Sequence, residues 1–426
     1  MTGAKLPRKP HAMWLDTPRN PNAPLAGLKV LELARVLAGP WAGQILADLG
    51  ADVIKVESPD GDGTRKWGPP WIERDHGERE AAYYHAANRG KRSIIADFRD
   101  EDDLARIHDL ASSADVVLEN FKTGTLTKFG LDYKSLAQVN ARLVYCSITG
   151  FGQTGPRAHE AGYDFVIQAM SGFMALTGEP KGQPMKMGIS ISDLTCGLYS
   201  VIGIQAALAM RARTGRGQHV DMALLDCSVG LLASQAMHFL TTGENPPRMG
   251  NEHAQVSAYG VFPVADGKVV LAPANDGLFR RLLTLLGRND LLTDERFATN
   301  EGRLANREEL DAIIAGETSK WQMDELLADC AAAGIPAGRV PGATGVWVDG
   351  KKITAIGVGV RRWVTLHGFA FNVMTDLEYF NLIVPCGIKD RPATSLSALL
   401  GRMVSVTEVE QVLTEHFSVV FDRSVI

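Results

Sequence analysis

The chain has 426 residues, a formal net charge of −5, and hydrophobic and charged fractions of 45% and 22%. That much apolar material supplies a large core and predicts two or three domains, while the absence of a basic excess argues against a nucleic-acid partner. The 5 cysteines share no metal-type spacing, which favours a reducing compartment and predicts a cytoplasmic location. Residues 1–22 carry no apolar leader, and no run of about eighteen apolar residues occurs, which disfavours secretion and a membrane span.

Strand and helix patterns alternate through the first half of the chain. Residues 27–33 form a short apolar run, residues 41–49 a helical pattern, and residues 52–57 a second apolar run. Further strands are expected at 91–97, 115–118, 143–148 and 218–224, and helices at 101–112 and 195–211. This order predicts an α/β domain with a Rossmann-like parallel sheet covered by helices. No GxGxxG follows the first strand, so a nicotinamide or flavin enzyme is disfavoured.

The second half has a mixed character. Asp266-Gly267 between two apolar runs is a strong hairpin signal. Helical patterns follow at residues 277–286 and 319–333. Beyond residue 342 the pattern changes to β-type segments at 345–348 and 353–360, with a closing helix at 407–416. We therefore expect a smaller mixed domain and then an α+β segment.

Asp193 is the acidic residue that directly precedes the expected long helix. Aspartate at such a position is commonly the N-cap, which is a purely structural role. A helix N-terminus also favours the ionised carboxylate, which in a dry, glycine-lined pocket can attack a thioester carbonyl. Glycines are dense at residues 149–155 and at Gly172 and Gly178, where backbone N–H groups could approach an acyl oxygen. Both roles of Asp193 stay open on the residues alone.

An ordered series of segments between about residues 24 and 340 resembles the class III CoA-transferase family, which includes formyl-CoA transferase and α-methylacyl-CoA racemase. The matching stretches lie at residues 36–40 (VLAGP), 49–57 (LGADVIKVE), 88–93 (NRGKRS), 117–121 (VLENF), 162–164 (GYD), 168–172 (QAMSG), 214–218 (TGRGQ) and 334–338 (GIPAG).

The resemblance implies that Asp193 is the nucleophile in transfer of CoA from an acyl-CoA to a carboxylic acid, through an aspartyl anhydride and an aspartyl-CoA thioester. It implies CoA contacts at Leu37, Ala38, Asn120, Phe121, Lys128 and Tyr163. It also implies a homodimer, and a CoA thioester as substrate without a metal or a permanently bound cofactor. Without the resemblance, Lys128 would be read as a solvated charge and Tyr163 as a core aromatic residue.

Two departures from the family pattern bear on the substrate. Leu37 replaces the glutamine of formyl-CoA transferase, and residues 243–258 lack that enzyme's glycine loop, so oxalate is not supported as the acceptor. Tyr163 stands where the racemase branch has histidine, and tyrosine is a poor base near neutral pH. The sequence therefore favours CoA transfer over racemization.

From about residue 339 the chain is similar instead to the C-terminal part of lipoyl(octanoyl) transferase. The matching stretches lie at residues 345–348 (GVWV), 351–357 (KKITAIG), 363–370 (WVTLHGFA), 384–388 (VPCGI) and 394–396 (TSL). By this resemblance Cys386 would accept the acyl group and Lys352 would lower the pKa of its thiol. Otherwise Cys386 is expected to be an inert, buried thiol.

The substrate loops in the N-terminal half of that enzyme are missing from the chain, as is the segment with which CoA-transferases normally end. We therefore divide the chain into an extension (1–23), a CoA-transferase large domain (24–225), a small domain (226–338) and an octanoyltransferase-like fragment (339–426). CoA transfer by Asp193 is the leading hypothesis. The alternatives are octanoyl transfer by the tail, with acyl carrier protein and a lipoyl domain as partners, an acyl-CoA racemase, and an inactive hybrid of two incomplete enzymes.

Overall fold

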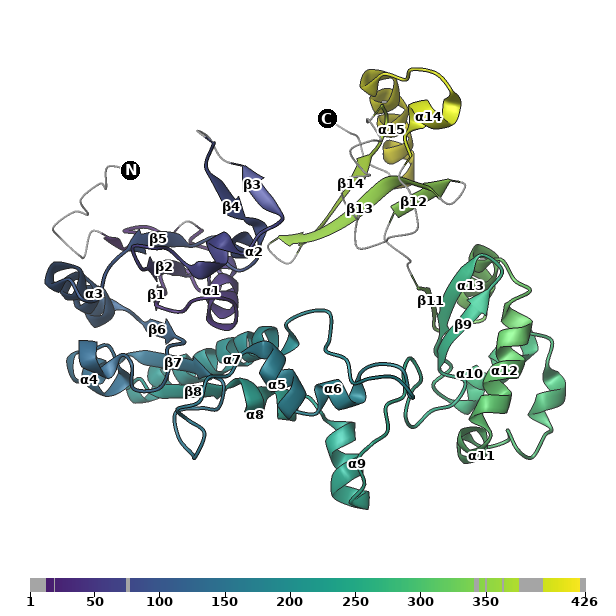
Figure 1. Cartoon of the computed structure of the whole chain (residues 1–426), viewed down its shortest axis with the longest axis horizontal. Coiled ribbons are helices and arrows are strands. Elements are labelled where there is room, and N and C mark those ends of the chain that lie inside the picture. Colours follow the sequence, from purple (N-terminus) through teal and green to yellow (C-terminus); the bar gives the residue numbers. More distant parts are fainter. Residues whose placement is uncertain are drawn as a thin grey trace. The chain divides into compact units, whose positions relative to one another are not determined.

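The structure is a computed structural model that describes residues 13–18, 20–73, 77–340, 345–348, 351–361, 364–374 and 394–421. The chain divides into two compact units, Met1–Gly250 and Asn251–Ile426 (Figure 1). The four-part division expected from the sequence remains a prediction.

A six-stranded sheet forms the framework of the first unit, in the order β5-β2-β1-β6-β7-β8, with every neighbouring pair parallel. Its strands are β1 (Lys29–Glu32), β2 (Asp52–Glu57), β5 (Arg92–Ile95), β6 (Val116–Glu119), β7 (Val144–Thr149) and β8 (His219–Ala223). The strand order runs outwards from β1 to β5 and then restarts with β6 on the other side of β1. Sheets of this kind bind ligands at such a switch point, beyond the carboxyl ends of the strands. The expected parallel α/β fold is confirmed.

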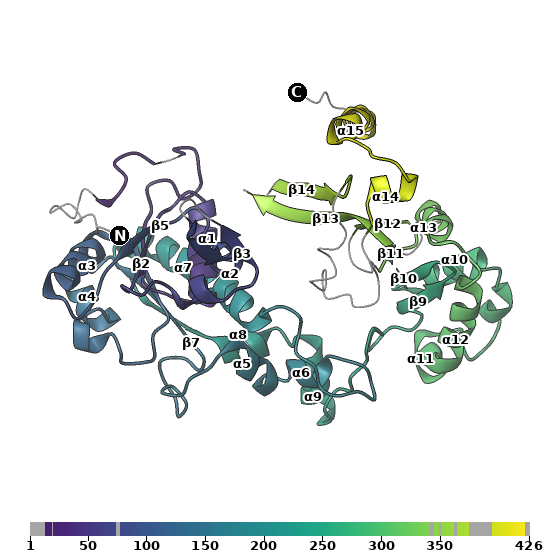
Figure 2. The ribbon, with the colours of Figure 1, turned by 45° about the horizontal axis from the view of Figure 1, so that its top comes forward.

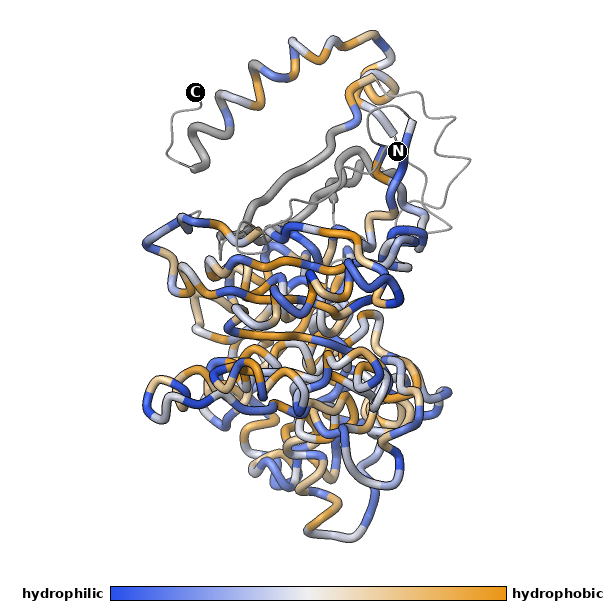
Figure 3. The backbone as a smooth tube through the Cα atoms, turned by 90° about the vertical axis from the view of Figure 1, so that its left-hand side faces the viewer, coloured by the Kyte–Doolittle hydropathy of each residue, from blue (hydrophilic) through white to orange (hydrophobic). Residues whose placement is uncertain are grey.

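Successive side chains of the strands pack into two separate hydrophobic cores. Val30 and Val53 belong to a cluster with α1 (Ala38–Asp48) and α7 (Ile191–Thr214), whereas the adjacent Leu31 and Ile54 belong to a cluster with α3 (Glu101–Ser113) and α4 (Tyr133–Val139). Successive residues of a strand point to opposite faces, so strands with apolar residues at every position are buried on both sides. The two helix pairs lie on opposite sides of the sheet in Figure 2, and Figure 3 shows hydrophobic stretches along the backbone.

The remaining elements of the first unit extend this framework. They are β3 (Trp71–Glu73), β4 (Arg79–Ala81), α2 (Ala82–Ala86), α5 (Asp164–Met170), α6 (Phe173–Leu176), α8 (Leu224–Gly230) and α9 (Ser234–Thr242), with 3-10 turns at Gly63–Lys66 and Thr127–Phe129. Strands β3 and β4 form a short antiparallel pair.

Helix α7 begins earlier and ends later than the helix expected at 195–211. It ends at Gly215, whose φ of 74° is the left-handed C-cap conformation that glycine adopts without strain. Among the described residues, α7 is long and apolar enough to suit a membrane span by length and composition, but its apolar content also serves the core. Cys196, Val201, Ile204 and Ala207 are buried in the cluster shared with α1.

The second unit contains a three-stranded antiparallel sheet in the order β11-β10-β9, covered by helices. Its elements are β9 (Gly260–Val264), β10 (Gly267–Leu271), α10 (Asp276–Leu285), α11 (Asn300–Ala305), α12 (Arg307–Thr318), α13 (Met323–Ala332) and β11 (Ala337–Arg339). The expected hairpin is present. Val264 pairs with Gly267, so the turn residues are Ala265 and Asp266 rather than Asp266 and Gly267. Asp266 is held there because its carboxylate accepts the Met323 N–H at 2.8 Å.

A second three-stranded sheet follows, in the order β12-β13-β14, with antiparallel pairing. Its strands are β12 (Gly345–Val348), β13 (Lys351–Arg361) and β14 (Val364–Phe371), and the helices α14 (Leu396–Leu400) and α15 (Val406–Phe421) come after it. Val373, Val404 and Val409 form a small buried cluster beside these helices. The α+β character expected of the tail is confirmed for the residues that the structure describes.

Candidate active site

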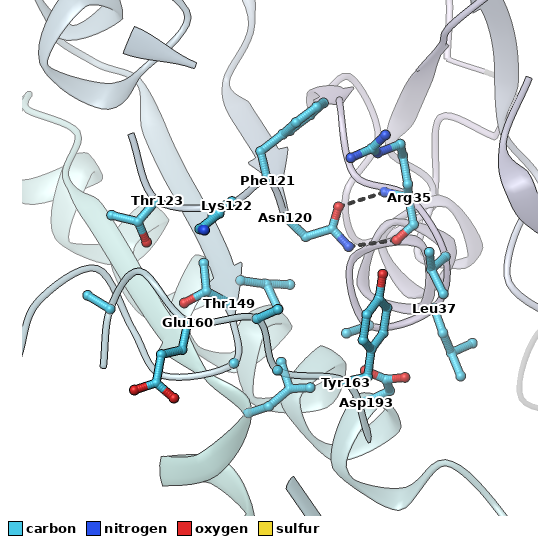
Figure 4. A pocket seen from close by; sticks show the side chains of 18 of the residues that line it. Arg35, Leu37, Asn120, Phe121, Lys122, Thr123, Thr149, Glu160, Tyr163 and Asp193 are labelled. Carbon is cyan, nitrogen blue, oxygen red and sulfur yellow. Dashed lines mark hydrogen bonds between the residues drawn. The ribbon is translucent and has the colours of Figure 1, made fainter. Parts of the chain in front are cut away.

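A cavity of about 390 Å³ lies beyond the carboxyl ends of β1, β6 and β7, at the switch point of the sheet (Figure 4). Its walls come from residues 35–38 after β1, 120–123 after β6, 148–150 at the end of β7, 160–163 before α5, and Asp193 on α7. Asp193 and five of the six expected CoA contacts thus line one cavity. They are Leu37, Ala38, Asn120, Phe121 and Tyr163.

Asp193 does not cap its helix, which corrects the structural alternative raised by the sequence. Helix α7 begins at Ile191 with Ser190 as the N-cap, so Asp193 lies in the first turn. Burial, with a smaller contribution from the Asp164 carboxylate, raises the pKa of Asp193 from 3.8 to about 7. A carboxylate with this pKa is poorly solvated and about half ionised at neutral pH, which makes it a better nucleophile than a free aspartate.

Asp164 performs the capping role. Its Oδ1 accepts the N–H groups of Ser192 at 2.9 Å and Asp193 at 3.4 Å. Its Oδ2 accepts the amide of the fully buried Gln168 at 2.7 Å. A carboxylate from another helix therefore fixes the first turn of α7 and holds Asp193 in place. The sequence showed Asp164 only as part of a family motif, because a cap supplied from a distant segment leaves no local pattern.

The wall after β1 is held by Asn120, the residue that directly follows β6. The Asn120 side chain accepts the Arg35 N–H at 2.8 Å and donates to the Arg35 carbonyl at 2.6 Å (Figure 4). The Arg35 guanidinium lies 4.5 Å from the centre of the Phe121 ring. The two loops at the switch point are thus joined, and together they present an aromatic face and a cation at the cavity.

Two tyrosines lie close to the first turn of α7 or to its cavity. The Tyr163 side chain is 67% exposed and lines the same cavity as Asp193 (Figure 4), so it is not a core aromatic residue. The Tyr83 hydroxyl hydrogen-bonds Ser190, and burial, with Asp193 and Asp164 nearby, raises the pKa of Tyr83. Sequence reasoning missed Tyr83, because nothing in the local pattern around α2 points to the start of α7.

Gly150 and Gly162 form a tight backbone contact in the cavity wall. A Cβ on Gly150 would come within 2.6 Å of the Gly162 Cα, so neither position has room for a side chain. Both glycines line the cavity, whereas Gly172 and Gly178 do not. The part of the expected glycine-rich region that the structure brings to Asp193 is therefore the segment at the end of β7 and its partner before α5.

Three candidate residues remain, Lys128, Lys352 and Cys386. Lys128 is exposed in the turn at Thr127–Phe129, with its ammonium 4.8 Å from the Phe129 ring, and does not line the cavity. Its role in CoA binding stays a prediction. Cys386 lies outside the described residues, and of Lys352 only the backbone position in β13 is described. Within the described ranges, no group of three or more His, Cys, Asp or Glu side chains is placed to hold a metal ion.

The fold agrees with what comparison with known proteins shows. The model of CoA-transferase family III matches residues 25–360, and the chain belongs to this family. It is 54% identical to the succinate–glutarate CoA-transferase of Agrobacterium fabrum, over 80% of this chain and 86% of that one. It is 41% identical to the acetyl-CoA:oxalate CoA-transferase of Acetobacter aceti, over 76% and 83%.

Solved structures give the same result. A crystal structure of a CAIB/BAIF family protein from Brucella suis matches with a TM-score of 0.68 and 59% identity, covering 75% of this chain and 85% of that chain. The protein is therefore a CoA-transferase that uses CoA thioesters and carboxylic acids. The model of the lipoyl protein ligase A/B catalytic domain matches residues 319–418, which confirms the second resemblance in the tail.

The pKa of Asp193 predicts how the activity falls on the acid side of its pH profile. We expect kcat/KM for the acyl-CoA to fall about tenfold per pH unit below about pH 7, because only the ionised carboxylate attacks. Asp164→Asn keeps an acceptor for the two N–H groups but removes the negative charge that opposes ionisation of Asp193. The acid limb should then move to lower pH. If the acid limb of the pH profile of kcat/KM were the same in Asp164→Asn as in the wild type, a group other than Asp193 would control it.

Proposed function

We propose that the protein transfers CoA between two dicarboxylic acids through covalent intermediates on Asp193. The observation that carries the proposal is the position of the Asp193 carboxylate, partly buried in the first turn of α7 and facing a cavity at the switch point of the sheet.

In the first step a carboxylate oxygen of Asp193 attacks the thioester carbonyl carbon of the acyl-CoA. The C–S bond breaks, CoA leaves as the thiolate, and a mixed anhydride remains on Asp193. The thiolate then attacks the aspartyl carbonyl and expels the donor acid, which leaves an aspartyl-CoA thioester. The acceptor carboxylate then attacks the aspartyl-CoA carbonyl and releases the CoA thiolate, which leaves a second anhydride on Asp193. The thiolate attacks the acceptor's carbonyl carbon in this anhydride, releases the Asp193 carboxylate and departs as the acceptor's CoA thioester. One thioester replaces another, so no external energy source is needed.

The proposed dicarboxylic substrate class is supported by the relatives. The Agrobacterium protein is named for succinate and glutarate, the human relative of 39% identity for succinyl-CoA and glutarate, and the Acetobacter protein for acetyl-CoA and oxalate. Succinate, glutarate and oxalate each have two carboxylates, and only the acetate of the Acetobacter donor has one. The matched test uses succinyl-CoA as donor and compares glutarate with valerate, an acceptor of the same length that lacks the second carboxylate. A similar kcat/KM for the two acceptors would exclude a dicarboxylate site.

A homodimer is also proposed for the first unit. Large apolar side chains are exposed along α5, α7 and α9, among them Phe165 (58%), Ile202 (62%) and Leu240 (73%). Monomers rarely expose so many large apolar residues, and burial against a second copy would remove them from water. Sedimentation equilibrium should give twice the chain mass for the wild type and a lower mass for Ile202→Asp. A monomeric wild type would refute the dimer.

The match of residues 319–418 to the lipoyl protein ligase domain raises octanoyl transfer as a second candidate. We propose that the tail does not turn over, because the sequence shows no counterpart of the N-terminal substrate loops that, in lipoyl(octanoyl) transferase, supply the walls and backbone donors that orient an acyl chain. Octanoyl-acyl carrier protein and an apo lipoyl domain should therefore give no change in acceptor mass. Octanoylation by the wild type that is lost in Cys386→Ser would establish a second activity.

A further inference from the structure

The turn at residues 34–36, which leads from β1 into the cavity wall, has a strained backbone. Val36 has a φ of 70°, in the left-handed region that β-branched residues rarely adopt. Residues 35–38 line the cavity, so the strain lies at the site itself. Strained backbone of this kind persists only where the surroundings hold it, and it is often stored at functional sites.

Side chains from three other segments hold the backbone groups of this turn. Lys55 on β2 donates to the Ala34 carbonyl at 2.8 Å. Asn120 bonds both the N–H and the carbonyl of Arg35. Asp62 accepts the Val36 N–H at 3.3 Å. Three consecutive residues therefore have their backbone fixed by side chains, and no neighbouring strand or helix is needed to hold them.

Lys55 and Asp62 are themselves fixed in a buried cluster of charges. Both side chains are fully buried, and the Lys55 ammonium lies 3.0 Å from Asp62 Oδ2 and 3.2 Å from Glu32 Oε1. Lys91, which is 2% exposed, also binds Glu32, at 2.8 Å. Burying four charges carries a large desolvation cost that apolar residues of similar size would avoid. Stability alone is therefore a poor explanation for the cluster. Its contacts with the turn at residues 34–36 point to a role in holding that turn.

We propose that Lys55 and Asp62 are positioning residues for CoA binding, which, together with Asn120, hold the turn at residues 34–36 and so fix the cavity wall formed by residues 35–38. The inference rests on the proposed use of this cavity for the CoA thioester. Without the buried pair the backbone at Val36 relaxes to an unstrained conformation. The wall then has to be reordered each time CoA binds, which weakens binding.

Lys91 provides a matched control within the same cluster. Its ammonium bonds Glu32, Asn88 and the Pro40 carbonyl, but no backbone group of residues 34–36. Lys55→Met and Lys91→Met each remove one buried ammonium, so both should lower the melting temperature. Only Lys55→Met should weaken the binding of free CoA, by about tenfold or more, while Lys91→Met stays within about twofold of the wild type.

The experiment measures the Kd of CoA by calorimetry well below each melting temperature, together with KM and kcat for the acyl-CoA. Lys55→Met should raise KM more than it lowers kcat. Val36→Gly, which permits the same φ without strain but frees the turn, should weaken CoA binding with little loss of thermal stability. If Lys55→Met does not fold, the Kd of CoA for Val36→Gly tests the inference by itself.

Wild-type affinity in Val36→Gly, or equal losses of affinity in Lys55→Met and Lys91→Met, would overturn the inference. Neither result bears on whether Asp193 is the nucleophile. Conversely, a wild-type chain that binds no CoA would refute the proposed use of the cavity before any variant is compared.

Discussion

Asp193→Asn should reduce CoA transfer at least about a thousandfold, because the amide cannot form the anhydride or the thioester on which every later step depends. The substitution keeps the shape of the side chain, and the cap of α7 is supplied by Asp164, so the fold should be retained. Binding of free CoA should change little. Initial rates with succinyl-CoA and glutarate, together with the Kd of CoA, measure the two effects separately.

The same variant should be more stable than the wild type at alkaline pH. The folded-state pKa of Asp193 is raised from 3.8 to about 7, so the native state binds more protons than the unfolded state between about pH 4 and pH 7. Wild-type stability therefore falls as the pH rises through this window and levels off above it, whereas Asp193→Asn lacks this loss. Above pH 7 the variant should gain roughly 2 kcal/mol or more, measured by denaturant unfolding. If the wild type had the same free energy of unfolding at pH 5 and pH 8, the ionised Asp193 carboxylate would not be destabilised in the folded protein.

Gly197→Val should disrupt both the fold and the site. Gly197 lies one helical turn after Asp193, where α7 crosses α1, and a Cβ there would come within 2.8 Å of the Ala38 carbonyl and 3.0 Å of the Trp41 ring. The backbone carbonyl cannot move without shifting α1, and Ala38 lines the cavity opposite Asp193. We expect a loss of about 2–3 kcal/mol of stability from overpacking. CoA transfer should fall further than the lost stability explains, because the two walls of the site move apart.

Gly230→Ala is the matched control for this prediction. Gly230 is the last residue of α8, and a Cβ at this position would meet no atom within 4 Å. The control should match the wild type in melting temperature and rate. If Gly197→Val also matched the wild type, the close approach of α1 and α7 would not be what sets the geometry of the cavity.

The fold of the first unit could be predicted from the sequence because its signals are local. Strands such as Val116–Glu119 are short apolar runs, and helices such as Glu101–Ser113 have an aspartate cap and acidic first-turn residues. The resemblance to a family then placed Asp193, Asn120 and Leu37 in one site before any geometry was known, and the cavity contains all three.

The features that could not be predicted from the sequence depend on contacts between distant segments of the chain. The cap of α7 comes from Asp164, 28 residues before Ser192, so the local rule assigned the capping role to the wrong aspartate. The strain at Val36 has no sequence signal, since valine is unfavourable at a positive φ and only the contacts from Lys55, Asp62 and Asn120 make that conformation stable. Lys128 matched a family position but lies outside the cavity, because matching the position did not specify where its side chain lies.

The proposed mechanism requires CoA to become covalently attached to Asp193. The protein would be mixed with succinyl-CoA without an acceptor, quenched with acid within the first turnovers, and digested, and the peptide containing Asp193 would be weighed with and without prior borohydride reduction. We predict a CoA adduct on that peptide that borohydride removes by reducing the thioester to an alcohol, that glutarate discharges, and that is missing in Asp193→Asn. Full transfer activity with no adduct on the peptide, or an adduct that persists in Asp193→Asn, would show that Asp193 is not the nucleophile.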